Sequence, residues 1–325
     1  MLKRPLSLTG AFSFSNVDIL LQQLINGLVL GSVYALIALG YTMVYGILQL
    51  INFTHGEVLM VGAMISLLVV NALQSSFPAL HPALLILLAL AASVPVCMAL
   101  SALIERVAYR PLRNAPRLAP LITAIGLSIT LQTLAMIFFS PNPMVFPDLL
   151  PTTPIQIGGA FLAPKQLFIL VVSLALMMAL MLMVQKSPLG RSMRAVAENP
   201  QMALLMGIDP NRIVAITFML GAALAAVAGL ALAMNYNIVH FTMGFIPGLK
   251  AFTAAVLGGI GNLPGAVVGG LLLGMIESLG AGYIGDLTGG FLGSHYQDVF
   301  AFAVLILVLV IRPSGLLGER VADRP

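Results

Sequence analysis

The feature that most constrains this chain is a set of long apolar segments. No charged residue interrupts ALLILLALAASVPVCMALSALI (83–104), and neither proline, glycine nor a charge interrupts LFILVVSLALMMALMLMV (167–184). A transmembrane helix needs about 20 apolar residues, whereas a surface helix of a water-soluble protein keeps one polar face. These segments therefore predict helices that cross a membrane.

The composition of the chain agrees with this prediction. Of 325 residues, 60% are hydrophobic and 8% are charged, whereas soluble globular chains carry about 25% charged residues. We predict an all-α fold: a polytopic integral membrane helical bundle of about ten transmembrane or partly spanning helices, forming one transmembrane domain over residues 1–325. Its apolar runs lie at 18–39, 40–51, 57–74, 83–104, 118–140, 166–185, 213–234, 245–261, 264–282 and 297–311.

Lys and Arg residues predict the orientation. They concentrate in the segments 105–117 and 186–212 and recur in the tail 313–325, so these three parts are expected in the cytoplasm. The proline-rich segment 141–165 has few charges and is expected on the outer side. The net charge of +4 thus follows from topology, and no nucleic-acid partner is expected.

The side of the N-terminal tail, residues 1–17, depends on the short run 40–51. Two positive residues, Lys3 and Arg4, favour a cytoplasmic tail. That placement requires the run 40–51 to be a crossing of its own. If the run is only re-entrant, the N-terminus lies outside.

A polar cluster interrupts the apolar pattern in INFTHGEVLM (51–60). Thr54 and Glu57 have the spacing of a capping box, in which Thr54 caps the following helix and Glu57 bonds back to the Thr54 amide. Asn52 and His55 are not needed for the cap. They are candidates for the translocation pathway, or for hydrogen bonds to a neighbouring helix. No second His or Cys stands at ligand spacing from His55, so no metal site is expected.

Two further charges, Lys250 and Glu277, lie inside apolar runs. The topology places them at similar depth on adjacent, oppositely directed segments. An unpaired charge within a membrane is costly, so we expect the two side chains to face each other. The pair either fixes the hairpin or lines the pathway.

Enzyme motifs are missing from the sequence. The pattern G-x-x-x-x-G-K-[ST] does not occur, so the chain has no ATP site of that class. No Ser/His/Asp arrangement and no cluster of metal ligands stands out. We expect neither an enzyme nor a bound cofactor.

The cytoplasmic segment 186–212 is amphiphilic, with Met and Leu residues among charged ones. Asn199-Pro200 predicts the start of a short helix that ends near Gly207. Such a helix suits docking into a groove on a partner protein. The alternative is a helix that rests on lipid headgroups.

Three motifs resemble one known family. INFTHGEVLMVGAM, GRSMRAVAENPQMALLMGI and KAFTAAVLGGIGNLPGAVVGGLLLG occur in the order typical of the permeases of branched-chain amino acid ABC importers. The resemblance covers residues 18–318 and is closest to the smaller of the two permease types. It implies a multi-pass protein of the cell inner membrane.

The resemblance also implies partners: a second, related permease subunit, two ATP-binding cassette ATPases and a periplasmic amino-acid-binding protein. In this family a cytoplasmic E-A-A…G motif carries a coupling helix into the ATPase. Glu198 and Gly207 match the acidic residue and the glycine, while Asn199-Pro200 replaces the two alanines. The coupling residues implied are Arg191, Arg194, Glu198, Pro200, Ala203 and Gly207.

Two other functions remain open at this point. The same importer class could carry urea, short amides or other amino acids. An ion-coupled secondary transporter would need membrane-buried carboxylates, for which Glu57 and Glu277 are available.

Overall fold

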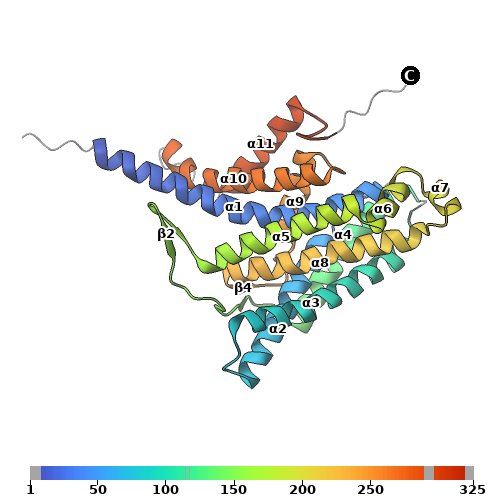
Figure 1. Cartoon of the computed structure of the whole chain (residues 1–325), viewed down its shortest axis with the longest axis horizontal. Helices are drawn as coiled ribbons and strands as arrows, with labels where there is room; N and C mark the ends of the chain where they lie inside the picture. Colours follow the sequence, from blue (N-terminus) through green and yellow to red (C-terminus); the bar gives the residue numbers. More distant parts are fainter. Residues whose placement is uncertain (1–8, 114, 117, 289–295, 319–325) are drawn as a thin grey trace, which may run out of the picture.

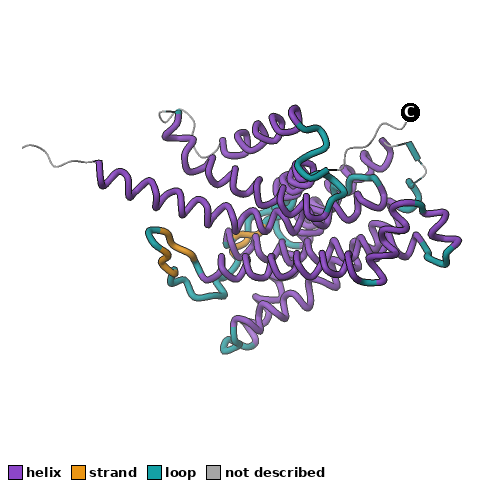
Figure 2. Tube along the Cα trace, turned by 45° about the horizontal axis from the view of Figure 1, so that its top comes forward, coloured by secondary structure: helices purple, strands orange, loops and turns teal. Residues whose placement is uncertain are grey.

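The structure, a computed structural model, describes residues 9–113, 115–116, 118–288 and 296–318. These residues are mostly helical, and Figure 2 shows that the few short strands lie in the loops. The helices are α1 (Thr9–Leu48), α2 (His55–Ser76), α3 (Pro82–Ile104), the π-helix η1 (Glu105–Tyr109), α4 (Leu118–Phe138), α5 (Pro164–Lys186), α6 (Pro188–Glu198), α7 (Pro200–Leu205), α8 (Pro210–Tyr236), α9 (Phe245–Gly258), α10 (Leu263–Leu287) and α11 (Gln297–Ile311).

Seven helices of the described chain, α1 to α5, α8 and α10, are long and apolar enough to cross a membrane, while α9 and α11 are shorter apolar helices. The prediction of an all-α polytopic bundle is confirmed. Seven and two make nine apolar helices rather than about ten. The difference arises because the runs 18–39 and 40–51 belong to one helix.

That helix, α1, is continuous from Thr9 to Leu48, so the prediction of a separate run at 40–51 is wrong. Gly40 does not break the helix, but admits the ring of His55. A Cβ atom at position 40 would lie 2.3 Å from His55 Nε2. The chain turns later, at 49–54, where Gln49 has a φ of 55°.

A continuous α1 changes the expected side of the N-terminus. Its first turns lie beside β2 (Ile155–Ile157) and β3 (Ala160–Leu162), where Gln22 donates to the Phe161 carbonyl (3.0 Å) and accepts from the Phe161 amide (2.8 Å). Figure 1 shows this end opposite α6 and α7. With the segment 186–212 in the cytoplasm, the start of α1 lies on the outer side. Residues 1–8 of the predicted tail, like residues 319–325, fall outside the described residues.

The centre of the bundle is formed by α1, whose residues 31–44 are all buried. It packs along α10 through glycines: Cβ atoms added at Gly270 and Gly274 would lie 2.4 Å from Ala35 Cα and 2.3 Å from Gly31 Cα. Only glycine allows backbones this close. The two helices run side by side in Figure 1.

The outer loops are tied to the bundle at a second point. The strand β1 (Met144–Val145) pairs antiparallel with β4 (Ile238–Val239), which follows α8. Nearby, the Asp148 carboxylate accepts from the Asn237 amide at 2.5 Å and from Lys165 at 3.5 Å. These donors, the Asn237 amide above all, hold the pKa of Asp148 below its usual value.

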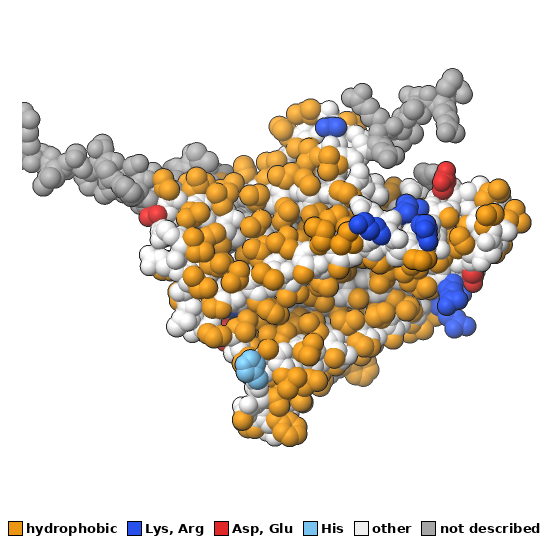
Figure 3. All heavy atoms as spheres, viewed as in Figure 1, with side chains coloured by type: hydrophobic (Ala, Val, Ile, Leu, Met, Phe, Trp, Pro, Cys, Tyr) orange, Lys and Arg blue, Asp and Glu red, His pale blue; other side chains and the backbone are white. Residues whose placement is uncertain are grey.

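The distribution of hydrophobic and positively charged side chains on the surface is the one expected of a protein that spans a membrane. On the face drawn in Figure 3, hydrophobic side chains cover the middle, and most of the visible Lys and Arg gather at the end that carries α6 and α7. This arrangement is what the positive-inside rule predicts for a cytoplasmic end.

Candidate translocation cavity and coupling surface

The polar cluster at 51–60 is buried at the junction of α1 and α2. Thr54 precedes α2 as predicted, but its side chain makes no capping bond. An N-cap residue usually has an extended backbone. Thr54 instead has a helical backbone, with a φ of −72° and a ψ of −9°. The Thr54 hydroxyl instead donates to Asn52 Oδ1, which also accepts from the Tyr109 hydroxyl at 2.9 Å. The predicted capping box is therefore wrong.

Glu57 also departs from the predicted cap, because its side chain turns toward α4. It is 1% exposed, and its Oε1 accepts from Ser128 Oγ at 2.9 Å and from Gln132 Nε2 at 2.8 Å. Its second oxygen, Oε2, has no hydrogen-bond partner among the described residues. Sequence reasoning missed Ser128 and Gln132, although their i, i+4 spacing in an apolar helix was a usable signal.

Asn52 and His55, two of the predicted pathway residues, are each 2% exposed. Asn52 bonds to Tyr109 of the neighbouring η1. The His55 ring packs edge-on against Tyr41, with the ring centroids 4.9 Å apart. These contacts are those of helix–helix packing, and a role of either residue in the pathway stays a prediction.

The predicted pairing of Lys250 with Glu277 is confirmed. Lys250 Nζ lies 2.7 Å from Glu277 Oε1, and a second carboxylate, Asp298 Oδ1 on α11, lies 2.6 Å from the same nitrogen. The ammonium also stands over the ring of Tyr34, 5.8 Å from its centroid. The network joins α9, α10, α11 and α1, so its contacts are structural whatever else it does.

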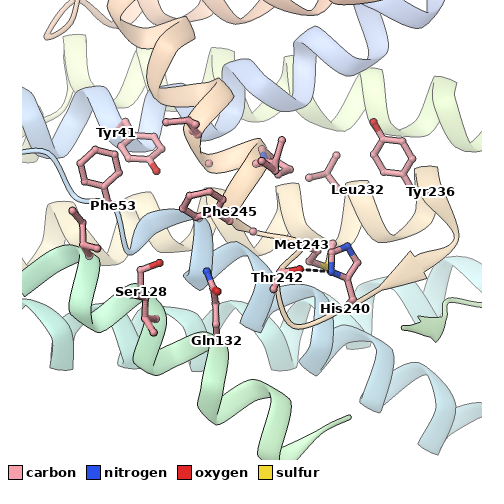
Figure 4. A pocket seen from close by; sticks show the side chains of 18 of the residues that line it. Tyr41, Phe53, Ser128, Gln132, Leu232, Tyr236, His240, Thr242, Met243 and Phe245 are labelled. Atoms are coloured by element: carbon pink, nitrogen blue, oxygen red, sulfur yellow. Dashed lines mark hydrogen bonds between the residues drawn. The ribbon is translucent and has the colours of Figure 1, made fainter. Parts of the chain in front are cut away.

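A cavity of about 960 Å³ opens between α2, α4, α8 and α9. Its walls are mostly apolar and carry four polar side chains from two regions: Ser128 and Gln132 on α4, and His240 and Thr242 after α8. Figure 4 shows Ser128 and Gln132 extending from α4 toward Phe245. Within the described part of the chain, none of Asn52, His55, Lys250 and Glu277 lines this cavity.

His240 and Thr242 form the other polar part of the wall, with Nδ1 of the ring 2.9 Å from the threonine hydroxyl (Figure 4). Partial burial lowers the pKa of His240 below its ordinary value. This shift favours the neutral form of the imidazole in the cavity wall.

The segment 186–212, which is expected in the cytoplasm, contains α6 and α7. The predicted short helix is confirmed: α7 spans Pro200–Leu205, Asn199 Oδ1 accepts from the amides of Gln201 and Met202 at 3.0 Å each, and Gly207 ends the turn with a φ of +82°. A left-handed φ of this kind favours glycine.

The predicted coupling residues fall on two faces. Most are exposed: Arg191, Arg194, Glu198, Pro200 and Gly207. Ala203 is 3% exposed and anchors α7 to the bundle. Arg194 donates to the Val184 carbonyl and so closes the end of α5. Beside them, Leu205 and Met206, two apolar residues of the amphiphilic segment, are 80% and 79% exposed and form an apolar tip.

A polar cluster links the segment that follows α3 to α8. Glu105 is fully buried, and Arg110 and Arg113 both bond to its carboxylate, Arg110 at 3.0 Å. Arg113 also donates to Asn211 Oδ1 at 2.7 Å, one residue into α8. The first turn of α8, the helix that follows α7, is thereby linked to the region of η1. Tyr109, at the end of η1, bonds in turn to Asn52.

Comparison with known proteins identifies the class. Residues 23–309 match the family described as branched-chain amino acid transport system / permease component. The chain is 49% identical to the high-affinity branched-chain amino acid transport system permease protein BraD of Pseudomonas aeruginosa, over 92% of this chain and 96% of that protein. It is 44% identical to the corresponding protein LivH of Escherichia coli, with the same coverage.

A more distant similarity covers less of the chain. The autoinducer 2 import system permease protein LsrC of Photorhabdus laumondii is 32% identical over 42% of this chain and 40% of its own length. No solved structure matches.

The fold and these similarities define a multi-pass permease of the inner membrane. The chain belongs to the family of branched-chain amino acid transport permease components. A component of this kind forms the membrane passage of a transport system and is not an enzyme by itself.

Proposed function

We propose that this chain is the permease subunit of an ABC importer that carries branched-chain amino acids across the inner membrane. The observation that carries the proposal is the identity of 44–49% over 92% of the chain to relatives named for high-affinity transport of these amino acids. The largely apolar cavity between α4 and α9 suits aliphatic side chains and supports the same substrate class.

The partners follow from the same proposal. A second permease subunit completes the passage, two ATP-binding cassette ATPases dock on the cytoplasmic face, and a periplasmic binding protein delivers the amino acid. The exposed tip formed by Leu205 and Met206, with Arg191 and Glu198 beside it, suits insertion into a groove of an ATPase. The partner ATPases, and not this chain, would then hydrolyse ATP.

Coupling would act through α8. A displaced α7 pulls on the first turn of α8, which is bonded through Arg113 and Glu105 to η1. At its other end α8 contributes Leu232 and Tyr236 to the cavity wall. A movement at the cytoplasmic face therefore reaches the cavity through one helix, as required of a gate with two states.

The function is tested by reconstituting the permease with its ATPases and binding protein in proteoliposomes. Uptake of labelled leucine is expected to require ATP and to be insensitive to ionophores, and labelled urea should not accumulate. Accumulation driven by an ion gradient in the absence of the ATPases would overturn the proposal in favour of a secondary transporter. Uptake of urea instead of leucine would overturn the substrate.

Docking of α7 is tested with Leu205→Asp, because a charge on the apolar tip opposes burial in a groove. We expect loss of ATPase co-purification and of uptake. Gln201→Asp introduces the same charge on the same helix at an exposed polar position and serves as the control. A Glu198→Ala, Gly207→Ala double variant is expected to hydrolyse ATP without uptake. Normal uptake by that double variant would refute coupling through α7.

A further inference from the structure

We propose that Gln132 and Ser128, held in place by Glu57, form the contact for the α-ammonium group of the transported amino acid. The inference rests on the proposed function and deepens it, because it assigns one part of the cavity to one group of the substrate. It places recognition on α4.

The first step is the direction of the hydrogen bonds. Ser128 donates its hydroxyl proton to Glu57 Oε1, and Gln132 donates an amide proton to the same atom. The groups left over are the Gln132 carbonyl oxygen and the lone pairs of Ser128 Oγ, which are acceptors, and the second amide proton of Gln132, which is a donor. Both residues line the cavity, so its α4 wall presents acceptor atoms and suits a donor such as an ammonium.

The second step is the unsatisfied carboxyl oxygen. Glu57 is 1% exposed, and its Oε2 bonds to no group in the described chain. Buried polar atoms are nearly always hydrogen-bonded, so this acceptor indicates a donor other than the residues that the structure describes. The backbone of Gly56, next to Glu57, is part of the cavity wall.

The third step is what surrounds this polar spot. The nearest wall residues on α4 are Ile125 and Ile129, and Leu232 and Phe245 complete an apolar lining. In the described part of the chain no Lys or Arg lines the cavity, so nothing there competes with a cationic group. A largely apolar space with acceptor atoms on α4 fits an amine that bears a branched aliphatic chain.

The test measures protection of a reporter thiol in the reconstituted transport complex. Ile129→Cys, in a Cys97→Ala background that removes the chain's single cysteine, places the thiol on the cavity wall and leaves Gln132 and Ser128 intact. The probes are leucine, 3-methylbutylamine, which keeps the ammonium, and 4-methylpentanoate, which lacks it. We expect leucine and the amine to slow modification by a water-soluble thiosulfonate, and the acid to have no effect.

Adding Gln132→Leu should weaken protection by the amine about tenfold, the loss of one charge-assisted hydrogen bond. Thr133→Val removes a hydroxyl from the same helix outside the cavity and should leave protection unchanged. Equal protection by acid and amine, an unmodified thiol, or protection indifferent to Gln132→Leu would each overturn the inference. If the parent complex transports leucine in these cases, the proposed function stands; if it does not, that function fails independently.

Discussion

Two helices of this permease are held to the bundle in different ways. α10 lies against α1 along a seam of glycines whose backbones touch, and the buried ion pair of Lys250 and Glu277 ties α10 to α9. α4 buries only one narrow stripe of residues and is tied to α2 through the hydrogen bonds of Glu57 with Ser128 and Gln132.

The difference separates a rigid unit, α1 with α10, from a helix that is held less tightly, α4. Backbone contact between glycines has one close geometry, so α1 and α10 move together. The hydrogen bonds that hold α4, from neutral donors to one carboxyl oxygen, constrain the geometry less than this packing, because either partner is able to bond to water or to a ligand instead. The cavity therefore has one wall, α4, that is able to shift relative to the unit formed by α1 and α10.

The largest effect is expected at the ion pair. Lys250→Leu leaves two carboxylates, Glu277 and Asp298, without their shared cation, which is expected to cost about 3–5 kcal/mol of unfolding free energy. Glu277→Gln should cost less, because Lys250 keeps Asp298. Thermal unfolding of the purified complex measures both, and a smaller loss in Lys250→Leu than in Glu277→Gln would contradict the shared network.

Charge reversal sharpens this prediction. If Lys250 and Glu277 were the only members of the network, Lys250→Glu combined with Glu277→Lys would restore stability fully. Asp298 makes a third member, and Lys250→Glu sets a carboxylate against it. Rescue by the double reversal is therefore expected to be partial, and adding Asp298→Lys should improve it.

The second effect lies at the glycine seam. Gly274→Ala forces a Cβ atom to within 2.3 Å of the Gly31 backbone, and overpacking of this kind costs about 1–3 kcal/mol. Gly126→Ala on α4 is the matched control, because no atom lies within 4 Å of its added Cβ. It is expected to be neutral or slightly stabilising. Equal losses in both variants would remove the contrast between the two helices.

The smallest effect is expected at Glu57. Glu57→Gln keeps an oxygen that accepts from Ser128 and Gln132, so it should cost less than about 1 kcal/mol. Glu57→Leu removes the acceptor and leaves two donors unpaired, which should cost about 1–3 kcal/mol. A loss in Glu57→Gln as large as that in Lys250→Leu would show that Glu57 is held by a charge.

Part of this arrangement could be predicted from the sequence. The apolar runs predict the helices because lipid requires long uncharged segments, and their direction alone places Lys250 and Glu277 at one depth. The α7 helix follows from Asn199-Pro200 and Gly207.

The parts that were missed depend on contacts between distant segments. The motif at Thr54 and Glu57 fits a local cap, yet a partner 71 residues away holds the carboxylate. Asp298 starts a different helix, and nothing in its neighbourhood points to Lys250. The separate run predicted at 40–51 is wrong for a similar reason, because the His55 ring that occupies the space at Gly40 lies beyond the turn.

The length of α1 has a mechanical consequence. Forty helical residues make a rod of about 60 Å, about twice the thickness of the hydrocarbon layer. A rod that pivots near its middle has a lever arm of about 30 Å, so a tilt of about 10° sweeps its outer tip through about 5 Å. Small rotations deep in the bilayer would thus be amplified at the periplasmic rim, where a fluorophore on the first turns could register them.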